Sequence, residues 1–80
     1  MGKNQFLIEL GRQIKEVRKA KKLSQEQLAF RAEIDRSYMG SIERGERNVS
    51  FLTLIKVAIC LNCSVSDFTK NIPDDTRRSN

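Results

Sequence analysis

The stretch from Ser24 to Arg47 constrains the fold most strongly, because it carries the end signals of two short helices. Ser24 and Gln27 form a capping box, in which each side chain accepts a hydrogen bond from the other residue's backbone amide. Asp35 is a second N-cap, and Gly45 stands where a helix end favours a left-handed residue. The predicted helices cover residues 24–32 and 35–44, with a tight turn between them.

A longer helix is predicted before this pair, over residues 5 to about 21. Apolar side chains recur there at the spacing of one helix face. They are Leu7, Leu10, Ile14 and Val17. No stretch of the chain shows the alternating β-branched pattern of a half-buried strand, so the sequence predicts an all-α fold.

Two more helices are predicted after the pair. Ser50 caps a fourth helix that ends near Leu61, where Asn62 can take the left-handed position that usually falls to Gly. Ser64 is expected to begin a short fifth helix, because Asp67 completes a second capping box with it. The chain is therefore expected to form five helices.

The 80 residues are expected to form one helical domain over residues 1–72 and a flexible tail over residues 73–80, which has no apolar face. The longest apolar run, Val57 to Leu61, is too short to span a bilayer, and no signal-peptide segment is evident. A soluble, cytoplasmic protein is expected.

Its charge of +5 is unevenly distributed: residues 1–49 carry 11 Lys and Arg against 7 Asp and Glu.

Enzymatic chemistry is not expected, and neither is a metal or a cofactor. The chain has no histidine, which excludes hydrolase triads and zinc-protease sites. Cys60 and Cys63 form a C-x-x-C motif, but two thiols are too few for a closed zinc site and no βαβ unit surrounds them. We expect them to be small buried apolar groups in a reducing cytoplasm, with a redox sensor as the alternative.

The second helix of the central pair is expected to expose a polar row. The row consists of Arg36, Ser37, Tyr38 and Ser41. A helix pair with this layout places side chains in the major groove of DNA, where Arg can bond guanine O6 and N7 together. The alternative is a solvated polar face without a task.

Two segments resemble the Cro and lambda-repressor type of helix-turn-helix family, also called the xenobiotic-response-element family. They read L-G-R-Q-I-K-E-V-R-K-A-K-K-L-S-Q-E-Q-L-A and I-D-R-S-Y-M-G-S-I-E-R-G-E-R-N-V-S, and the second is similar to restriction-modification controller proteins. The resemblance implies a five-helix lambda-repressor-like DNA-binding domain with its helix-turn-helix at helices 2 and 3. It implies base contacts from Arg36, Ser37 and Ser41, and DNA backbone contacts from Ser24, Gln25, Tyr38, Arg44, Arg47 and Asn48.

The resemblance also suggests a partly buried ion pair between Arg18 and Glu43. Two positions depart from the family pattern, Glu33 and Ile59, and Ile59 stands where an exposed polar residue is common. Glu33 stands in the turn where Gly is usual, at a cost of ~1 kcal/mol if the backbone there is left-handed. The fourth helix carries a second apolar stripe on the side away from the core. It consists of Leu52, Ile55 and Ile59.

This stripe predicts a two-fold homodimer across the fourth helix, which would read half-sites about one turn of double-stranded DNA apart, ~34 Å, in a palindromic operator. The resemblance implies a controller that acts on its own promoter, activating from one site and repressing when a second dimer fills the next, with RNA polymerase as a further partner. A prophage or chromosomal repressor and an antitoxin remain alternatives. A protein-interaction module that lost DNA binding is an alternative of a different class.

Overall fold

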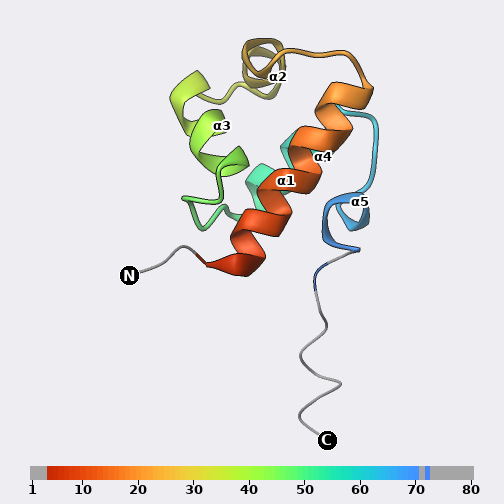
Figure 1. Ribbon diagram of the computed structural model, residues 1–80. Helices are drawn as coiled ribbons and strands as arrows, with labels where there is room; N and C mark the ends of the chain where they lie inside the picture. The colour runs from red at the N-terminus through yellow and green to blue at the C-terminus, as the bar shows by residue number, and fades with distance from the viewer. Residues whose placement is uncertain (1–3, 71, 73–80) are drawn as a thin grey trace, which may run out of the picture.

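The computed structural model describes residues 4–70 and residue 72 and contains five helices in this part of the chain, without strands (Figure 1). Their bounds are α1 (Gln5–Ala20), α2 (Gln25–Ala32), α3 (Arg36–Glu43), α4 (Phe51–Cys60) and α5 (Ser66–Thr69). The all-α prediction is confirmed, and none of these helices has the length and apolarity needed to cross a membrane. The tail predicted over residues 73–80 lies outside the described residues.

The predicted caps explain where the helices begin. Ser24 and Gln27 form the complete capping box, with N–O distances of 3.0 and 2.8 Å. Asp35 accepts hydrogen bonds from the Ser37 and Tyr38 amides, and Ser50 accepts one from the Thr53 amide at 3.1 Å. These bonds satisfy amides that lack a partner within the helix, and so fix each helix start.

The prediction for α5 is wrong at its start. The helix begins at Ser66, and only half of the expected capping box forms, because the Ser64 amide donates to Asp67 at 3.0 Å without the reciprocal bond. The Ser64 hydroxyl lies 2.7 Å from the Ser66 hydroxyl instead. Val65 already has helical dihedrals, so the chain enters α5 through a turn.

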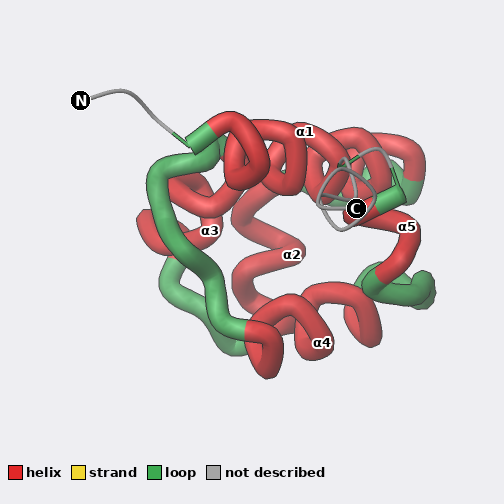
Figure 2. Tube along the Cα trace, turned by 90° about the horizontal axis from the view of Figure 1, so that it is seen from below, coloured by secondary structure: helices red, strands yellow, loops and turns green. Residues whose placement is uncertain are grey.

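The helices surround one apolar core. α1 packs against α3 and α5, and α2 packs against α3 and α4. Figure 2 shows α1 and α4 on opposite sides of the bundle, with α2 between them and α3 and α5 at the two ends. The most deeply buried large side chains come from all five helices and the turn after α4. They are Ile14, Leu28, Met39, Val57, Leu61 and Phe68.

Two glycines set the position of α3 against α1. A Cβ on Gly11 would lie 2.3 Å from the Ile42 carbonyl oxygen, so the two backbones approach as closely as only glycine allows. Gly45 follows α3 and has the left-handed conformation that was predicted for it, with a φ of 76°. A Cβ there would lie 2.5 Å from Ile8 Cα. The C-terminal end of α3 is therefore held on the first turns of α1.

Candidate nucleic-acid interface

The first turn of α3 presents two polar side chains to solvent. Asp35 accepts hydrogen bonds from the Ser37 and Tyr38 amides at 2.9 and 3.3 Å, which fixes this turn without using the side chains of Arg36 and Ser37. Both residues are exposed, and neither side chain has a hydrogen bond or ion pair within the described part of the chain. They are available to an external acceptor or donor.

The expectation that Ser41 points outward is wrong. Ser41 is only 7% exposed, and its hydroxyl donates to the Tyr38 carbonyl oxygen at 2.7 Å. A serine in a helix satisfies its hydroxyl in this way when it is removed from water. The structure therefore gives no support to Ser41 as a base contact, and Tyr38, half-buried, is less open than expected.

Basic side chains follow directly from the end of α3. The Arg47 guanidinium carbon lies 5.5 Å from the centre of the Tyr38 ring, within the range of a cation–π contact. Arg44 Nε lies 3.1 Å from a Glu46 carboxylate oxygen, and this hydrogen bond raises the pKa of the Arg44 guanidinium. Both arginines and Asn48 are exposed, so these three candidate contacts to the DNA backbone lie together after the C-terminal end of α3.

The Arg18–Glu43 ion pair suggested by the family resemblance is present in the structure. Arg18 Nε and Nη2 donate to the two Glu43 oxygens at 2.7 and 3.0 Å, and both side chains are nearly removed from solvent. Arg18 also donates to the Leu23 carbonyl at 2.8 Å. The bidentate geometry joins α1 to the last residue of α3 and fixes the orientation of the candidate reading helix.

Gln25 extends this pair to α2. Its amide nitrogen donates to Glu43 at 3.0 Å, which leaves one amide hydrogen for a further acceptor. A Cβ on Gly40 would lie 3.2 Å from Gln25 Oε1 and 3.1 Å from Arg44 Nη1, so both side chains lie over this glycine. The N-terminus of α2, with Ser24 as its cap, therefore lies beside α3, and such a helix end favours phosphate.

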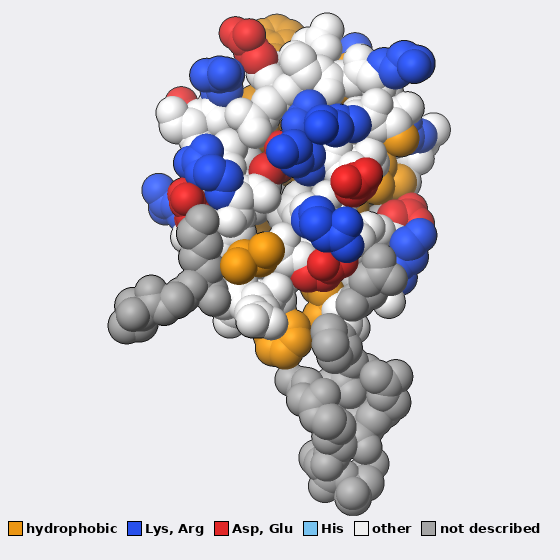
Figure 3. Space-filling model, viewed as in Figure 1, with side chains coloured by type: hydrophobic (Ala, Val, Ile, Leu, Met, Phe, Trp, Pro, Cys, Tyr) orange, Lys and Arg blue, Asp and Glu red, His pale blue; other side chains and the backbone are white. Residues whose placement is uncertain are grey.

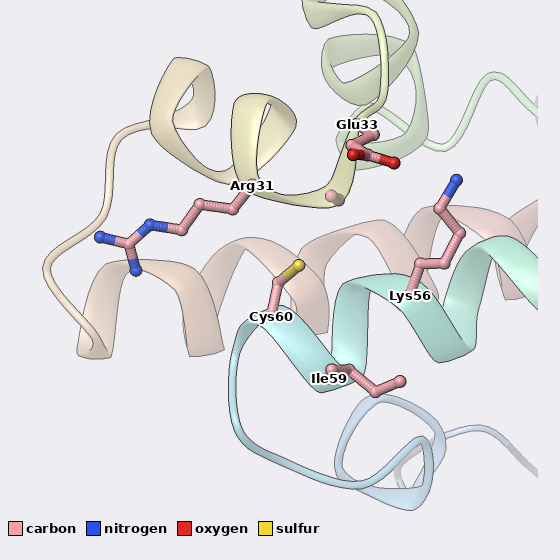
Figure 4. Close-up of a pocket in the computed structure, with 6 residues that line it drawn as sticks. Arg31, Glu33, Lys56, Ile59 and Cys60 are labelled. Carbon is pink, nitrogen blue, oxygen red and sulfur yellow. The ribbon is translucent and has the colours of Figure 1, made fainter.

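A second surface is apolar and lies on α4. We call the exposed or half-exposed side chains Phe51, Leu52, Ile55 and Ile59 the α4 apolar surface. Leu52 is 72% exposed and Ile59 is 71% exposed, whereas Leu54, Val57 and Ala58 on the opposite side are buried. Figure 4 shows Ile59 and Cys60 at the pocket between α2 and α4, with Cys60 turned toward α2. No described residue of α5 or of the N-terminal segment covers this stripe.

The two cysteines are less buried than expected. Cys60 and Cys63 are free thiols of intermediate exposure, and Cys60 contributes to a shallow pocket between α2 and α4. Burial, together with the negative charge of Asp67, raises the pKa of the Cys63 thiol. A raised pKa disfavours the reactive thiolate. Within residues 4–70 and 72, no group of three or more potential ligands could hold a metal ion.

Charge alone does not locate the interface. On the face shown in Figure 3, Lys and Arg side chains are spread out and interspersed with Asp and Glu. The site is therefore defined by position, namely the exposed first turn of α3, the nearby α2 N-terminus and the arginines after α3.

Sequence reasoning missed three features of this region. It placed Gln25 at a phosphate without its bond to Glu43, and it assigned no role to Glu46. It also passed over Phe30, which is 83% exposed on α2. The helical spacing of Leu28, Ala29 and Ala32 contained the signal for Phe30, because a residue between them falls on the other side of the helix.

Comparisons with known proteins agree with this geometry. Residues 14–68 match the helix-turn-helix family described as HTH_3. The control protein C.MunI of Mycoplasma sp is 40% identical over 70 residues, which are 86% of this chain and 95% of that protein.

Two solved structures extend the comparison. The restriction-modification controller C.AhdI from Aeromonas hydrophila has a TM-score of 0.79 at 43% identity, over 81% of this chain and 98% of that one. The biofilm regulator SinR, solved in complex with DNA, has a TM-score of 0.71 at 40% identity, over 74% of this chain and 95% of that one. Each similarity covers most of this chain.

Proposed function

Because the chain belongs to the Cro/C1-type helix-turn-helix family of DNA-binding transcription regulators, which are not enzymes, we propose that it is a homodimeric restriction-modification controller acting on its own promoter. The observation that carries the proposal is that Arg36 and Ser37 on the first turn of α3 are exposed and have no side-chain partner among the described residues. The names of the relatives C.MunI and C.AhdI support the controller subfamily.

In the proposed complex, the first turn of α3 enters the major groove. Arg36 bonds guanine O6 and N7 with two parallel hydrogen bonds, and Ser37 donates to or accepts from a neighbouring base edge. Contacts to the DNA backbone come from both sides of this turn. They are made by Ser24, Gln25, Tyr38, Arg44, Arg47 and Asn48.

A second copy of the chain covers the α4 apolar surface in this proposal. Leu52 and Ile59 are exposed at the two ends of the stripe on α4. This suits a two-fold contact, in which Leu52 of one copy lies against Ile59 of the other and the reverse. Such pairing sets the two α3 helices about one turn of DNA apart, ~34 Å, and matches a palindromic operator.

Regulation follows from occupancy. One dimer bound beside the promoter would recruit RNA polymerase, and a second dimer on an adjacent site would block it. The protein would act on the bacterial nucleoid in the cytoplasm. The names of the relatives C.MunI and C.AhdI support this part of the proposal.

Selection from a pool of random DNA duplexes tests the proposal. We expect the purified protein to enrich an inverted repeat with half-site centres about one helical turn apart. Enrichment of a single half-site would contradict the dimer. No enrichment of any sequence would contradict the regulator and would favour a protein-interaction module.

A further inference from the structure

The ion pair between Arg44 and Glu46 lies within the proposed DNA interface. Arg44 Nε is 3.1 Å from the Glu46 carboxylate, and both side chains remain accessible to solvent. Arg44 is one of the side chains proposed to contact the DNA backbone. The same guanidinium therefore has an anionic partner already in the free protein.

The end of α3 fixes where Glu46 lies. The Gly45 amide donates to the Ile42 carbonyl at 3.0 Å, and the Glu46 amide donates to the Ser41 carbonyl at 2.9 Å. This pair of bonds is a Schellman motif, and the left-handed φ of 76° at Gly45 is part of it. The backbone of Glu46 is thus part of the helix cap, two residues from Arg44, rather than part of a free loop.

The other side of the Arg44 guanidinium lies toward α2. Arg44 Nη1 and Gln25 Oε1 both lie over Gly40, because a Cβ there would be 3.1 Å from the first and 3.2 Å from the second. Gln25 occupies the first position of α2, where backbone amides favour an anion. A phosphate bound at this helix end would therefore lie near the Arg44 guanidinium, which is paired with Glu46.

We propose that Glu46 competes with DNA phosphate for Arg44 and so lowers the affinity of the protein for DNA of any sequence. This inference rests on the proposed DNA-binding function. A phosphate that pairs with Arg44 must displace the carboxylate and then lie near its negative charge. Glu46 already neutralises Arg44 in the free protein. The contact of Arg44 with a phosphate therefore releases fewer counterions from the DNA than the contact of an unpaired arginine would.

Replacing Glu46 by Gln tests the competition with little change in shape. We expect Glu46→Gln to tighten binding to operator and to random duplexes alike, by about three- to tenfold at moderate salt. The plot of log K against log salt should become steeper by about 1, because one more arginine displaces counterions on binding. Fluorescence anisotropy over a series of salt concentrations measures both quantities.

Two control variants separate this mechanism from a change in net charge. Glu16→Gln removes the same charge from an exposed position on α1 and should leave the affinity within about twofold of wild type. In an Arg44→Ala background, Glu46→Gln should lose most of its effect, because the competed side chain is gone. Thermal unfolding of each variant checks that the fold is retained.

The outcomes distinguish this inference from the function on which it rests. If wild type binds DNA and Arg44→Ala weakens binding, but Glu46→Gln matches wild type or Glu16→Gln, the competition is refuted and the regulator stands. A gain by Glu46→Gln that persists fully without Arg44 would also refute it. If wild type binds no DNA, both proposals fall.

Discussion

Arg18 and Glu43, 25 residues apart in the chain, form a buried bidentate pair with N–O distances of 2.7 and 3.0 Å. We expect Arg18→Met to lower the free energy of unfolding by about 3 to 5 kcal/mol, because it leaves the Glu43 charge buried without its cation. The double variant Arg18→Met/Glu43→Leu should recover much of that loss. Urea denaturation measures both.

The exposed pair Arg12–Glu9, at 2.9 Å, is the matched control. Arg12→Met should lower the free energy of unfolding far less than Arg18→Met does, since water screens the remaining charge. Equal losses in the free energy of unfolding for Arg12→Met and Arg18→Met would show that burial does not determine how much the loss of Arg18 destabilises the protein.

Glu33, which stands in the turn between α2 and α3 where Gly is usual, takes left-handed dihedrals of φ 58° and ψ 44°. We expect Glu33→Gly to stabilise the protein by about 0.5 to 1 kcal/mol, because glycine adopts this conformation without steric cost. Asn62→Gly, at φ 55°, should gain less, since asparagine tolerates the same region. A larger gain at Asn62 than at Glu33, measured by urea denaturation, would contradict this reasoning.

Much of the fold was predictable because its signals are local. The caps at Ser24 and Asp35 and the left-handed Gly45 depend on side chains and backbone within a few residues. The start of α5 was missed although it is also local, because the Ser64 hydroxyl bonds Ser66 rather than an amide.

The candidate site was less predictable because its geometry depends on contacts between helices. Ser41 was expected in the exposed polar row with Arg36, but its burial depends on which other elements cover α3. The bond from Gln25 to Glu43 joins residues 18 positions apart, and no local pattern indicates it. The exposure of Cys60 likewise depends on how α2 lies against the end of α4.

The α4 apolar surface should hold two copies together. We expect Ile59→Glu to convert a dimer to a monomer, because it buries a charge in an apolar contact. Phe30→Glu places the same charge at an exposed aromatic position on α2 and should leave the dimer intact. Sedimentation equilibrium decides, and an Ile59→Glu variant that remains dimeric would exclude this interface.

Cys63 should react slowly with alkylating agents in the folded protein. Burial and the Asp67 charge raise its pKa, so its reaction rate in a Cys60→Ser background should rise with pH through a midpoint above that of the unfolded chain. Asp67→Asn should lower this midpoint, because it removes the negative charge that disfavours the thiolate. Iodoacetamide labelling followed by mass spectrometry gives the rates, and an unchanged midpoint in Asp67→Asn would contradict the assigned cause.

The first turn of α3 is proposed to read bases, while the arginines beyond it contact the DNA backbone. The most direct test of this proposal compares Arg36→Ala and Arg47→Ala on selected operator and on random duplexes over a series of salt concentrations. Arg36→Ala should lose about 1 to 3 kcal/mol on the operator and little on random DNA, with specificity relaxed at one base pair. Arg47→Ala should weaken both DNAs alike and reduce the salt slope by about 1. Equal losses on operator and random DNA for Arg36→Ala would contradict base reading by Arg36.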